Sequence, residues 1–442
     1  MSQKPLAYIL LWFLFQLLVN CQSIAINPAH RFLHTATFIN NKLYILYGSS
    51  EEIVNDFFYL DFSEPFNIQE LTWELIPWED LTDAHTVPSH NGAASVKGGA
   101  DNNTLFLYGG ESDEWDKQFA LVYTYNPVTN SWNIPTISGI IDTTVRRKDL
   151  TGIIDDNGKM YLWGGMEVIK ENVDGRDGNY FNDMLILDTI NLNWGRGSLV
   201  GAPTARYNYG ATLLPNNNII YMGGYNGADL TLYQVYLYNT VYDIWSVKTT
   251  LGKIPSNRDG FSIILGLDGQ RIIIFGGITT TAGLAPEDSL YELNLINFEW
   301  YIPKISGQIP KSRAYHKANV IGNYMVVSFG SGYLHTESDI LLLDISNYNE
   351  YIWTNNFVPS NNTQSNSAPS ATSVSSPQTH SDYPHSDNLL PAHESDKSPI
   401  NMIGVLVGSL FAFILLLFGG FFLYKWNKIK QEKKNATQIL EN

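Results

Sequence analysis

Six short apolar runs, each ending in Gly-Gly or a close variant, constrain the fold of this chain more than any other feature. Their first glycines lie 53 to 61 residues apart, which is the spacing of a repeated unit. Each run is rich in β-branched or aromatic residues and is closed by a glycine, so it predicts a buried strand rather than a helix. The six runs end at Gly48, Gly109, Gly164, Gly223, Gly276 and Gly330.

Each unit contains signals for three further strands. A tight turn such as 39–42 or 155–158 precedes the glycine run and predicts a first hairpin. After the glycines come a variable loop and a third strand that ends in Asp or Asn, predicted at 57–61, 122–126, 184–188, 235–239, 290–294 and 340–344. A tryptophan follows that turn residue in every unit, at Trp73, Trp132, Trp194, Trp245, Trp300 and Trp353.

Four antiparallel strands at this period predict one propeller blade, and six such blades close into a ring without long open edges. The expected fold is therefore all-β, a six-bladed β-propeller, with one additional C-terminal transmembrane α-helix. The repeated tryptophans are expected to be core residues between neighbouring sheets. Every unit begins with its first strand and ends with its fourth, so no blade is shared between the chain ends; residues 24–26 are a candidate extra strand at the seam.

The net charge and the cysteine content limit the functions that this chain can have. The formal net charge is -16, with 27 Lys and Arg against 43 Asp and Glu. Nucleic-acid binding needs a basic field, so we expect no nucleic-acid partner. The single cysteine, Cys21, lies in a segment expected to be removed, so the mature chain would contain none.

The apolar runs into Gly-Gly, the pairs Asn55-Asp56 and Asn182-Asp183 before the third strand, and the spaced tryptophans resemble kelch repeats over residues 28–355. This resemblance implies a propeller but leaves function open, because kelch proteins include sugar oxidases, epimerases, adaptors and receptors. Galactose oxidase, a member with this central domain, implies a copper-radical site built on a cysteine cross-linked to a tyrosine. A mature chain without cysteine cannot form that cofactor, and we predict no cofactor and no metal site.

One arginine per unit is the main candidate for ligand binding. It stands 17 or 18 residues before the first glycine in five units, with Asn91 in the remaining one, and its predicted position is the face that carries the loops after Gly-Gly. In kelch adaptors that capture acidic peptides, arginines at matching positions make the contacts, so the resemblance implies a carboxylate-reading face. The alternative is that each arginine pairs with an acidic residue of the adjacent blade. The candidates are Arg31, Arg147, Arg206, Arg258 and Arg313.

Both ends of the chain suggest secretion and membrane anchoring. Residues 1–23 read as a signal peptide, with an uncleaved anchor as the alternative. Residues 400–424 are uncharged and apolar, long enough to span a bilayer, and lysines follow them. The positive-inside rule then predicts a single-pass type I protein with a cytosolic basic tail, 425–442, and the propeller, 24–358, on the extracellular or lumenal side.

Between the propeller and the span, residues 359–399 are rich in Ser, Thr and Pro and predict a disordered stalk. Asn102 and Asn361 begin N-glycosylation sequons on accessible segments. Within the span, Gly404 and Gly408 have the spacing of a helix-pairing motif, which suggests a homodimer.

We therefore expect a membrane-anchored propeller that recognises a protein, a peptide or an acidic glycan without catalysing a reaction. The alternative is a carbohydrate-active enzyme on the same fold that does not use the cysteine radical. No catalytic constellation is visible in the sequence.

Overall fold

A computed structural model describes most of the repeat region. All described residues belong to one compact unit, Met1–Thr363, while a second unit, Gln364–Asn442, lies wholly outside them. The predicted signal peptide, the stalk beyond residue 360, the predicted span and the tail also lie outside the described residues. No helix within the described part is long and apolar enough to cross a membrane. The described residues are 28–50, 56–70, 74–75, 90–112, 119–139, 145–169, 178–279, 283–284, 289–332 and 336–360.

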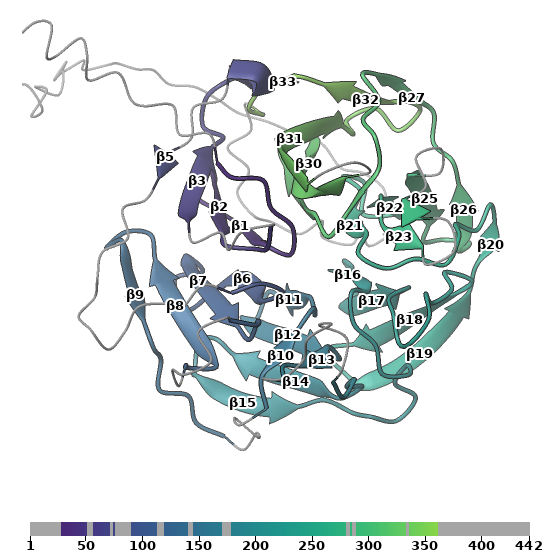
Figure 1. The fold of residues 1–442 in the computed structure, drawn as a ribbon. Helices are drawn as coiled ribbons and strands as arrows, with labels where there is room; N and C mark the ends of the chain where they lie inside the picture. Colours follow the sequence, from purple (N-terminus) through teal and green to yellow (C-terminus); the bar gives the residue numbers. More distant parts are fainter. Residues whose placement is uncertain are drawn as a thin grey trace, which may run out of the picture. The chain divides into compact units, whose positions relative to one another are not determined.

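Six antiparallel sheets are arranged around a central axis, as Figure 1 shows, and this confirms the all-β six-bladed propeller. Blade 1 contains β1 (Thr35–Ile39), β2 (Lys42–Leu46), β3 (Phe57–Asp61) and β5 (Glu74–Leu75). Blade 2 contains β6 (Ala94–Gly98), β7 (Thr104–Tyr108), β8 (Val122–Asn126) and β9 (Ser131–Asn133). Blade 3 contains β11 (Gly152–Ile154), β12 (Lys159–Trp163), β14 (Met184–Asp188) and β15 (Asn193–Arg196).

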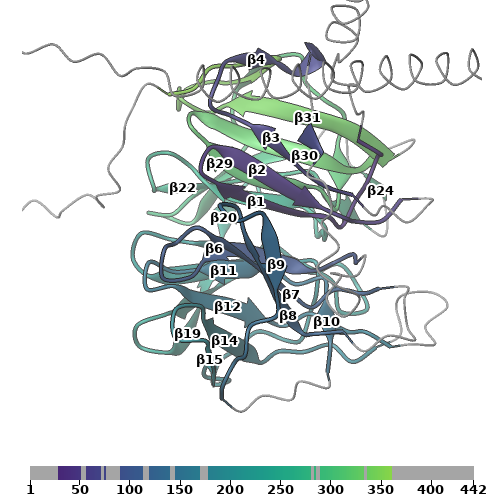
Figure 2. The ribbon, with the colours of Figure 1, turned by 90° about the vertical axis from the view of Figure 1, so that its left-hand side faces the viewer.

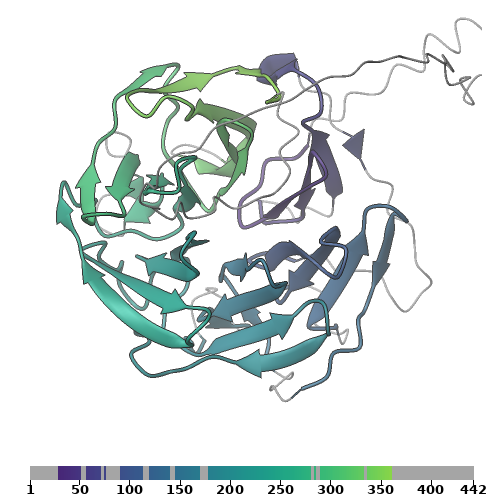
Figure 3. The same cartoon turned by 180° about the vertical axis from the view of Figure 1, so that it is seen from behind.

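The other three blades repeat this order, and the first strand of every blade lines the central channel. Figure 3 shows the ring of blades from behind. Blade 4 contains β16 (Gly210–Leu213), β17 (Asn218–Met222), β18 (Gln234–Asn239) and β19 (Ile244–Thr249). Blade 5 contains β21 (Ser262–Leu265), β22 (Arg271–Phe275), β25 (Leu290–Asn294) and β26 (Glu299–Tyr301). Blade 6 contains β29 (Lys317–Ile321), β30 (Tyr324–Gly332), β31 (Thr336–Asp344) and β32 (Tyr351–Thr354).

Short extra strands supplement the blades. They are β4 (Phe66–Asn67), β10 (Arg147–Lys148), β13 (Met166–Glu167), β20 (Leu251–Gly252), β23 (Ile278–Thr279), β24 (Gly283–Leu284), β27 (Ile305–Gly307), β28 (Arg313–Ala314) and β33 (Asn356–Phe357), and the described helix is a single 3₁₀ turn, η1 (Ile68–Glu70).

The predicted turns and third strands are largely confirmed. Ile39 pairs with Lys42 across a turn in which Asn40 and Asn41 both have positive φ, as a tight hairpin requires. The third strands of four blades have the predicted bounds, while β18 begins one residue earlier and β31 begins at Thr336. In β31 the extension pairs with β30 across a register shift between Ser328 and Gly330, so the longer hairpin contains a bulge.

The tryptophans lie between neighbouring sheets, as expected. Trp132 of blade 2 packs on Phe57 of blade 1, with ring centroids 5.4 Å apart, and Trp194 of blade 3 packs on Tyr108 of blade 2. Trp245 likewise meets Trp163 of blade 3. Since large aromatic side chains bury much apolar area, these contacts hold each blade on its predecessor. Trp73 lies outside the described residues.

Blades 1 and 6 meet at a seam built from the two ends of the repeat region (Figure 2). Leu43, Phe58, Val326 and Leu342 belong to one buried cluster that joins the two blades. Outside this cluster, β33 pairs with β4 and extends the contact between the first and last blades. The described residues thus close the ring without a shared blade, while residues 24–26 lie outside them.

Candidate functional site

A closed ring of backbone hydrogen bonds surrounds the central channel. In each blade, the residue two positions after the arginine position has positive φ, between 54° and 65°. Its N–H donates to the carbonyl of the equivalent residue in the preceding blade, and the first blade completes the circle by donating to the sixth. The donor-acceptor distances are 2.7 to 3.0 Å, and the ring residues are Leu33, Gly92, Asp149, Asn208, Gly260 and Tyr315.

A second ring of hydrogen bonds lies outside the first. One glycine at the end of each second strand donates its N–H to the carbonyl of the arginine position in the next blade, as in Gly110 to Arg147 (2.9 Å) and Gly330 to Arg31 (2.8 Å). An added Cβ on this glycine would lie within 3 Å of the segment that precedes the first strand of the same blade, so the position requires glycine. The six donors are Gly48, Gly110, Gly165, Gly224, Gly277 and Gly330.

This outer ring corrects the repeat register expected from the sequence. Gly48 and Gly330 align with the second glycine of the other pairs, and Tyr47 and Phe329 occupy the first position with φ of 48°. Gly48 donates to the carbonyl of His90, so His90, not Asn91, holds the arginine position of blade 2.

The five arginines are internal to their own blades. Each of these residues is 6% exposed or less, and its Nη1 donates to a carbonyl at the end of the same blade's second strand. Arg147 also forms a bidentate contact with Asp183, at 2.7 and 2.9 Å. Arg31 and Arg313 bind Asp56 and Asp339 in the same way.

Arg206 and Arg258 also donate to a nearby carbonyl and hydroxyl group two residues earlier in the chain. Arg206 donates to the carbonyl and Oγ1 of Thr204, and Arg258 to the carbonyl and Oγ of Ser256. Burial lowers the pKa of Arg206, and the neighbouring Tyr236 and Tyr209 oppose this effect.

These contacts correct one expectation and leave another open. The partners lie in the same blade as the arginine, whereas the sequence suggested the adjacent blade. The arginines also do not project freely around the channel mouth, because their donors are used to fix the chain between strands. Contact of any of the five with a ligand stays a prediction.

The central channel is a hollow of about 570 Å³ in the described unit. Its wall is formed by the first strands of all six blades and by the residues of the inner ring. Four ring residues carry side chains there, namely Leu33, Asp149, Asn208 and Tyr315. Lys317, at the start of β29, adds an ammonium group to the same wall.

Asp149 and Lys317 give the channel opposite charges in a partly desolvated space. Burial raises the pKa of Asp149 to about 6, and the nearby Glu111 adds to this effect while Lys148 and Lys317 oppose it. Burial lowers the pKa of Lys317, and Asp149 partly restores it. Within the described part of the chain, Asp149 Oδ1 is buried and receives no hydrogen bond.

Aromatic side chains lie beside the inner ring. Tyr180, Tyr207 and Tyr225 form a chain of ring contacts, with centroids 5.3 and 5.5 Å apart, across blades 3 and 4. Opposite them, Tyr315 contacts Phe32 of blade 1 and donates to Asp259 Oδ1 (3.2 Å). Tyrosine rings therefore lie near two carboxylates, that of Asp149 in the channel wall and that of Asp259, which accepts a hydrogen bond from Tyr315.

The other sequence candidates lie elsewhere. His34 and His316 are buried, and their Nε2 atoms lie 2.8 Å from Ser328 Oγ and Ser262 Oγ of the preceding blades. Asn102 is exposed in the turn before β7, where glycosylation stays a prediction; Asn361, Gly404 and Gly408 lie outside the described residues. Among the described residues, no group of three or more His, Cys, Asp or Glu side chains is placed to hold a metal ion.

Sequence reasoning missed the inner ring. Apart from glycine in two blades, its residues differ from repeat to repeat, so no repeated residue type marks the position. The signal that locates them is the fixed offset of two positions after the arginine, once His90 is assigned to blade 2.

Known proteins share this repeat region. The chain is 28% identical to Acyl-CoA-binding domain-containing protein 5 of Arabidopsis thaliana over 215 residues, covering 46% of this chain and 31% of the relative. It is 24% identical to human Host cell factor 2 over 229 residues, covering 47% and 27%. It is 26% identical to rat Kelch domain-containing protein 3 over 171 residues, covering 36% and 44%. The chain thus matches less than half the length of each of these relatives.

The solved structure of YjhT has a TM-score of 0.55 to this chain at 16% identity, covering 74% of this chain and 99% of YjhT. At that identity the likeness shows the fold alone. The sequence itself matches one repeat family over residues 33–265 and 216–377, which is most of the chain. The chain therefore belongs to the KLHDC2/KLHL20/DRC7 Kelch-repeats domain family.

Proposed function

We propose that this chain is a protein-recognition module that binds its partner at the mouth of the central channel. The observation that carries the proposal is the inner ring, in which the backbone of all six blades is fixed while the four ring residues that carry side chains differ. Leu33, Asp149, Asn208 and Tyr315 present apolar, acidic, amide and phenolic groups from equivalent positions. A rigid frame with varied side chains is suited to selecting one partner surface.

The chemistry of the mouth favours a basic side chain of the partner. Asp149 and Asp259 supply carboxylates, and Tyr207 and Tyr315 supply ring faces beside them. Lysine and arginine gain from both kinds of group when they are partly desolvated. Lys317 lies in the same channel and offers a donor to a carbonyl or carboxylate of the same segment. The partner is thus a protein segment with a basic side chain and an adjacent acceptor.

The test compares a mouth variant with a control. Leu33→Asn and Tyr315→Asn together remove two mouth side chains, and asparagine tolerates the positive φ of both positions. The control is Val128→Ser, in the exposed turn between β8 and β9. We expect the mouth variant to lose partners that the wild type and control retain in quantitative affinity capture. Equal capture by all three proteins would refute the site.

We also propose that the propeller is displayed on the extracellular or lumenal side of a membrane. The support is in the sequence: an apolar stretch at 400–424, lysines after it, a stalk at 359–399 and a signal-like start at 1–23. Glycosylation at Asn102 and Asn361, and pairing of two spans through Gly404 and Gly408, belong to the same proposal.

Protease added to intact cells tests this orientation. We expect an epitope in the propeller to be lost while an epitope after Asn442 is protected until the membrane is permeabilised. Loss of the C-terminal epitope first would reverse the orientation, and release of the whole chain by carbonate extraction would refute the anchor.

A further inference from the structure

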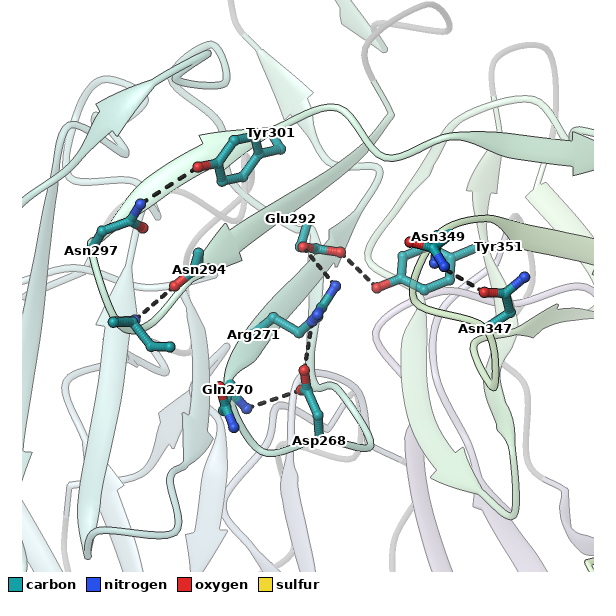
Figure 4. Close-up of polar contacts among 11 residues, drawn as sticks. Asp268, Gln270, Arg271, Glu292, Asn294, Asn297, Tyr301, Asn347, Asn349 and Tyr351 are labelled. Carbon is teal, nitrogen blue, oxygen red and sulfur yellow. Dashed lines mark hydrogen bonds and ion pairs between the residues drawn. The ribbon is translucent and has the colours of Figure 1, made fainter.

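The turn after the third strand has the same hydrogen bond in all six blades. The Asp or Asn that ends the strand accepts the backbone N–H of the residue two positions later, at 2.8 to 3.1 Å. Figure 4 shows this contact at Asn294 of blade 5. Because a side chain of the turn already satisfies that N–H, the residue that carries it can lie exposed at the tip of the turn. The six acceptors are Asp61, Asn126, Asp188, Asn239, Asn294 and Asp344.

The tip residue is aliphatic in four consecutive blades and serine in the other two. Blades 1 and 6 carry the exposed Ser63 and Ser346, which form the same backbone hydrogen bond. The turn therefore does not require an aliphatic residue at its tip. We call the four aliphatic tips of blades 2 to 5 the arc, and they are Val128 (78% exposed), Ile190 (46%), Val241 (62%) and Ile296 (75%).

The arc consists of separate apolar points and not of a groove. Each point belongs to a different blade, and exposed polar residues such as Thr129 and Asn191 follow the tips in sequence. A rigid protein partner would need one matched pocket for each point, whereas a bilayer surface deforms around all four. Tyr242, beside Val241, is 74% exposed, and tyrosine is enriched where proteins meet the membrane interface. These features favour a lipid surface as the occupant.

The chain leaves the described unit at the same end of the blades. In blade 6, Ile321 pairs with Tyr324 and Tyr324 with Asp344, so the turn between β29 and β30 lies beside the third-strand turn. Gly322 of this turn contacts Ser360, since an added Cβ would lie 2.8 Å from Ser360 Oγ. The last described residue therefore lies on the side of the molecule that carries the arc, and the proposed stalk continues from there.

The length of the stalk and the charge of the chain restrict the occupant further. A flexible chain of about forty residues has an end-to-end distance on the order of 35 Å. A tether of that reach keeps the side from which it starts near the bilayer at high effective concentration, so weak aliphatic contacts suffice. The formal net charge of -16 opposes contact with anionic lipid. Neutral lipid is thus the occupant that charge and tether favour.

We propose that the arc contacts the neutral phospholipid surface of the bilayer in which the chain is anchored. This inference rests on the membrane display proposed above. The channel mouth lies at the opposite end of the blades, where Arg313 pairs with Gly332 in blade 6. Contact through the arc therefore directs the mouth away from the membrane and leaves it open to a protein partner.

Quenching by spin-labelled lipid tests the contact. The full chain with Cys21→Ser is prepared without glycans, because Asn102 lies at the same end of blade 2, and is reconstituted into phosphatidylcholine vesicles. An environment-sensitive fluorophore is attached at Thr129→Cys, beside Val128, and in a separate sample at Ala228→Cys, an exposed position in the loop after the Gly-Gly of blade 4.

We expect spin-labelled phosphatidylcholine to quench the fluorophore at Thr129→Cys about twofold more than the one at Ala228→Cys. Added phosphatidylserine should reduce this difference, because the protein is acidic. Equal quenching at the two positions, or a difference that grows with phosphatidylserine, would overturn the proposal.

Serine, the tip residue of blades 1 and 6, removes the arc while keeping the turn. A variant with serine at all four tips should lower quenching at Thr129→Cys to the level of Ala228→Cys. The matched control is Ile309→Ser, at a residue that is 55% exposed and precedes the arginine of blade 6, and it should leave quenching unchanged. Undiminished quenching in the fourfold variant would overturn the arc.

Carbonate extraction of the same vesicles separates the contact from the anchor. A chain that is retained but shows no selective quenching refutes the arc and leaves the anchor in place. A chain that is released refutes the anchor and the contact together.

Two further outcomes would give the arc another occupant. Self-association in detergent that the fourfold serine variant abolishes would assign it to a second copy of the chain. Crosslinks from Thr129→Cys to residues 361–399 of the same molecule would assign it to the chain's own segment. Either result replaces the lipid surface proposed here.

Discussion

The N–H of Gly330, at the end of the second strand of blade 6, donates a hydrogen bond to the carbonyl of Arg31, before the first strand of blade 1. Beside it, Leu33 N–H donates to Tyr315 O at 3.0 Å and completes the inner ring. The two ends of the repeat region are thus joined by the same pair of contacts that join every other pair of blades. The seam repeats the internal contacts and needs no shared blade.

Gly330→Ala is expected to destabilise blade 6 at the residue that donates across this seam. The new Cβ would lie 2.8 Å from His316 Cβ and 3.0 Å from Ala314 O, at φ of +115°. Strain and steric conflict together should lower the free energy of unfolding by about 2 to 4 kcal/mol. Denaturant unfolding of the full chain measures the change.

Gly227→Ala is the matched control, because Gly227 has φ of +105° and nothing within 4 Å of an added Cβ. It should cost about 1 to 2 kcal/mol from backbone strain alone. An equal loss in the two variants would show that close approach at the seam contributes nothing.

Arg147→Lys tests the structural role of the repeated arginines. Lysine keeps the charge but cannot form the bidentate contact with Asp183 while also donating to Gly164 O. Because the side chain is buried, we expect a loss of about 1 to 3 kcal/mol in the free energy of unfolding. Arg196→Lys is the control: Arg196 also contacts Asp183, at 3.1 Å, but its side chain is half exposed, and we expect little change. Equal effects would refute a special role for the buried position.

The strands and turns of the fold could be predicted from the sequence, but the repeat register of the outer blades could not. Strands and turns follow from local patterns, such as the apolar run 43–46 before a glycine and the Asn40-Asn41 turn, and these predictions are confirmed. The repeat register in the outer blades was wrong because Tyr47 and Phe329 replace the first glycine. Each adopts positive φ and gains a ring contact, Tyr47 with His90 and Phe329 with His34.

The candidate site was less accessible to sequence reasoning. Repetition marks residues that every blade needs, and Arg31 or Arg313 proved to hold its own blade together. The channel side chains, such as Asp149 and Tyr315, differ between blades and meet only when the ring closes. A pattern search within one unit therefore finds the frame and misses the variable residues that line the channel.

Tyr351→Phe tests the contact between blades 5 and 6. Figure 4 shows Tyr351 directed at Glu292, whose other oxygen faces Arg271. The phenol donates to Glu292 Oε2 at 2.6 Å in a buried position. Its removal leaves a buried carboxylate oxygen without a donor, so we expect a loss of about 1 to 3 kcal/mol in the free energy of unfolding.

Tyr301→Phe is the control, because Tyr301 donates to Glu299 at the surface and water replaces that bond. We expect no measurable change in unfolding. If Tyr351→Phe also leaves the free energy of unfolding unchanged, the network of Arg271, Glu292 and Tyr351 contributes nothing to the docking of the two blades.

Asp149→Asn should alter the pH dependence of stability in a direction fixed by burial. The folded-state pKa of Asp149 is raised from 3.8 to about 6, so the folded protein holds this proton more tightly than the unfolded chain. Its contribution is favourable below pH 4 and is lost as pH rises to about 6, at a cost of about 2 to 3 kcal/mol. Asparagine tolerates the positive φ of this position and carries no charge.

The variant should therefore be more stable than the wild type above pH 6, with the difference shrinking as pH falls to 4. His316, whose pKa burial lowers to about 3, gives the opposite trend, since its contribution is lost as pH falls below 6.5; it is present in both proteins and cancels in the difference. Urea unfolding of both full chains from pH 4 to 7.5 measures this difference. A constant difference across that range would mean that the channel solvates the Asp149 carboxylate as well as bulk water does.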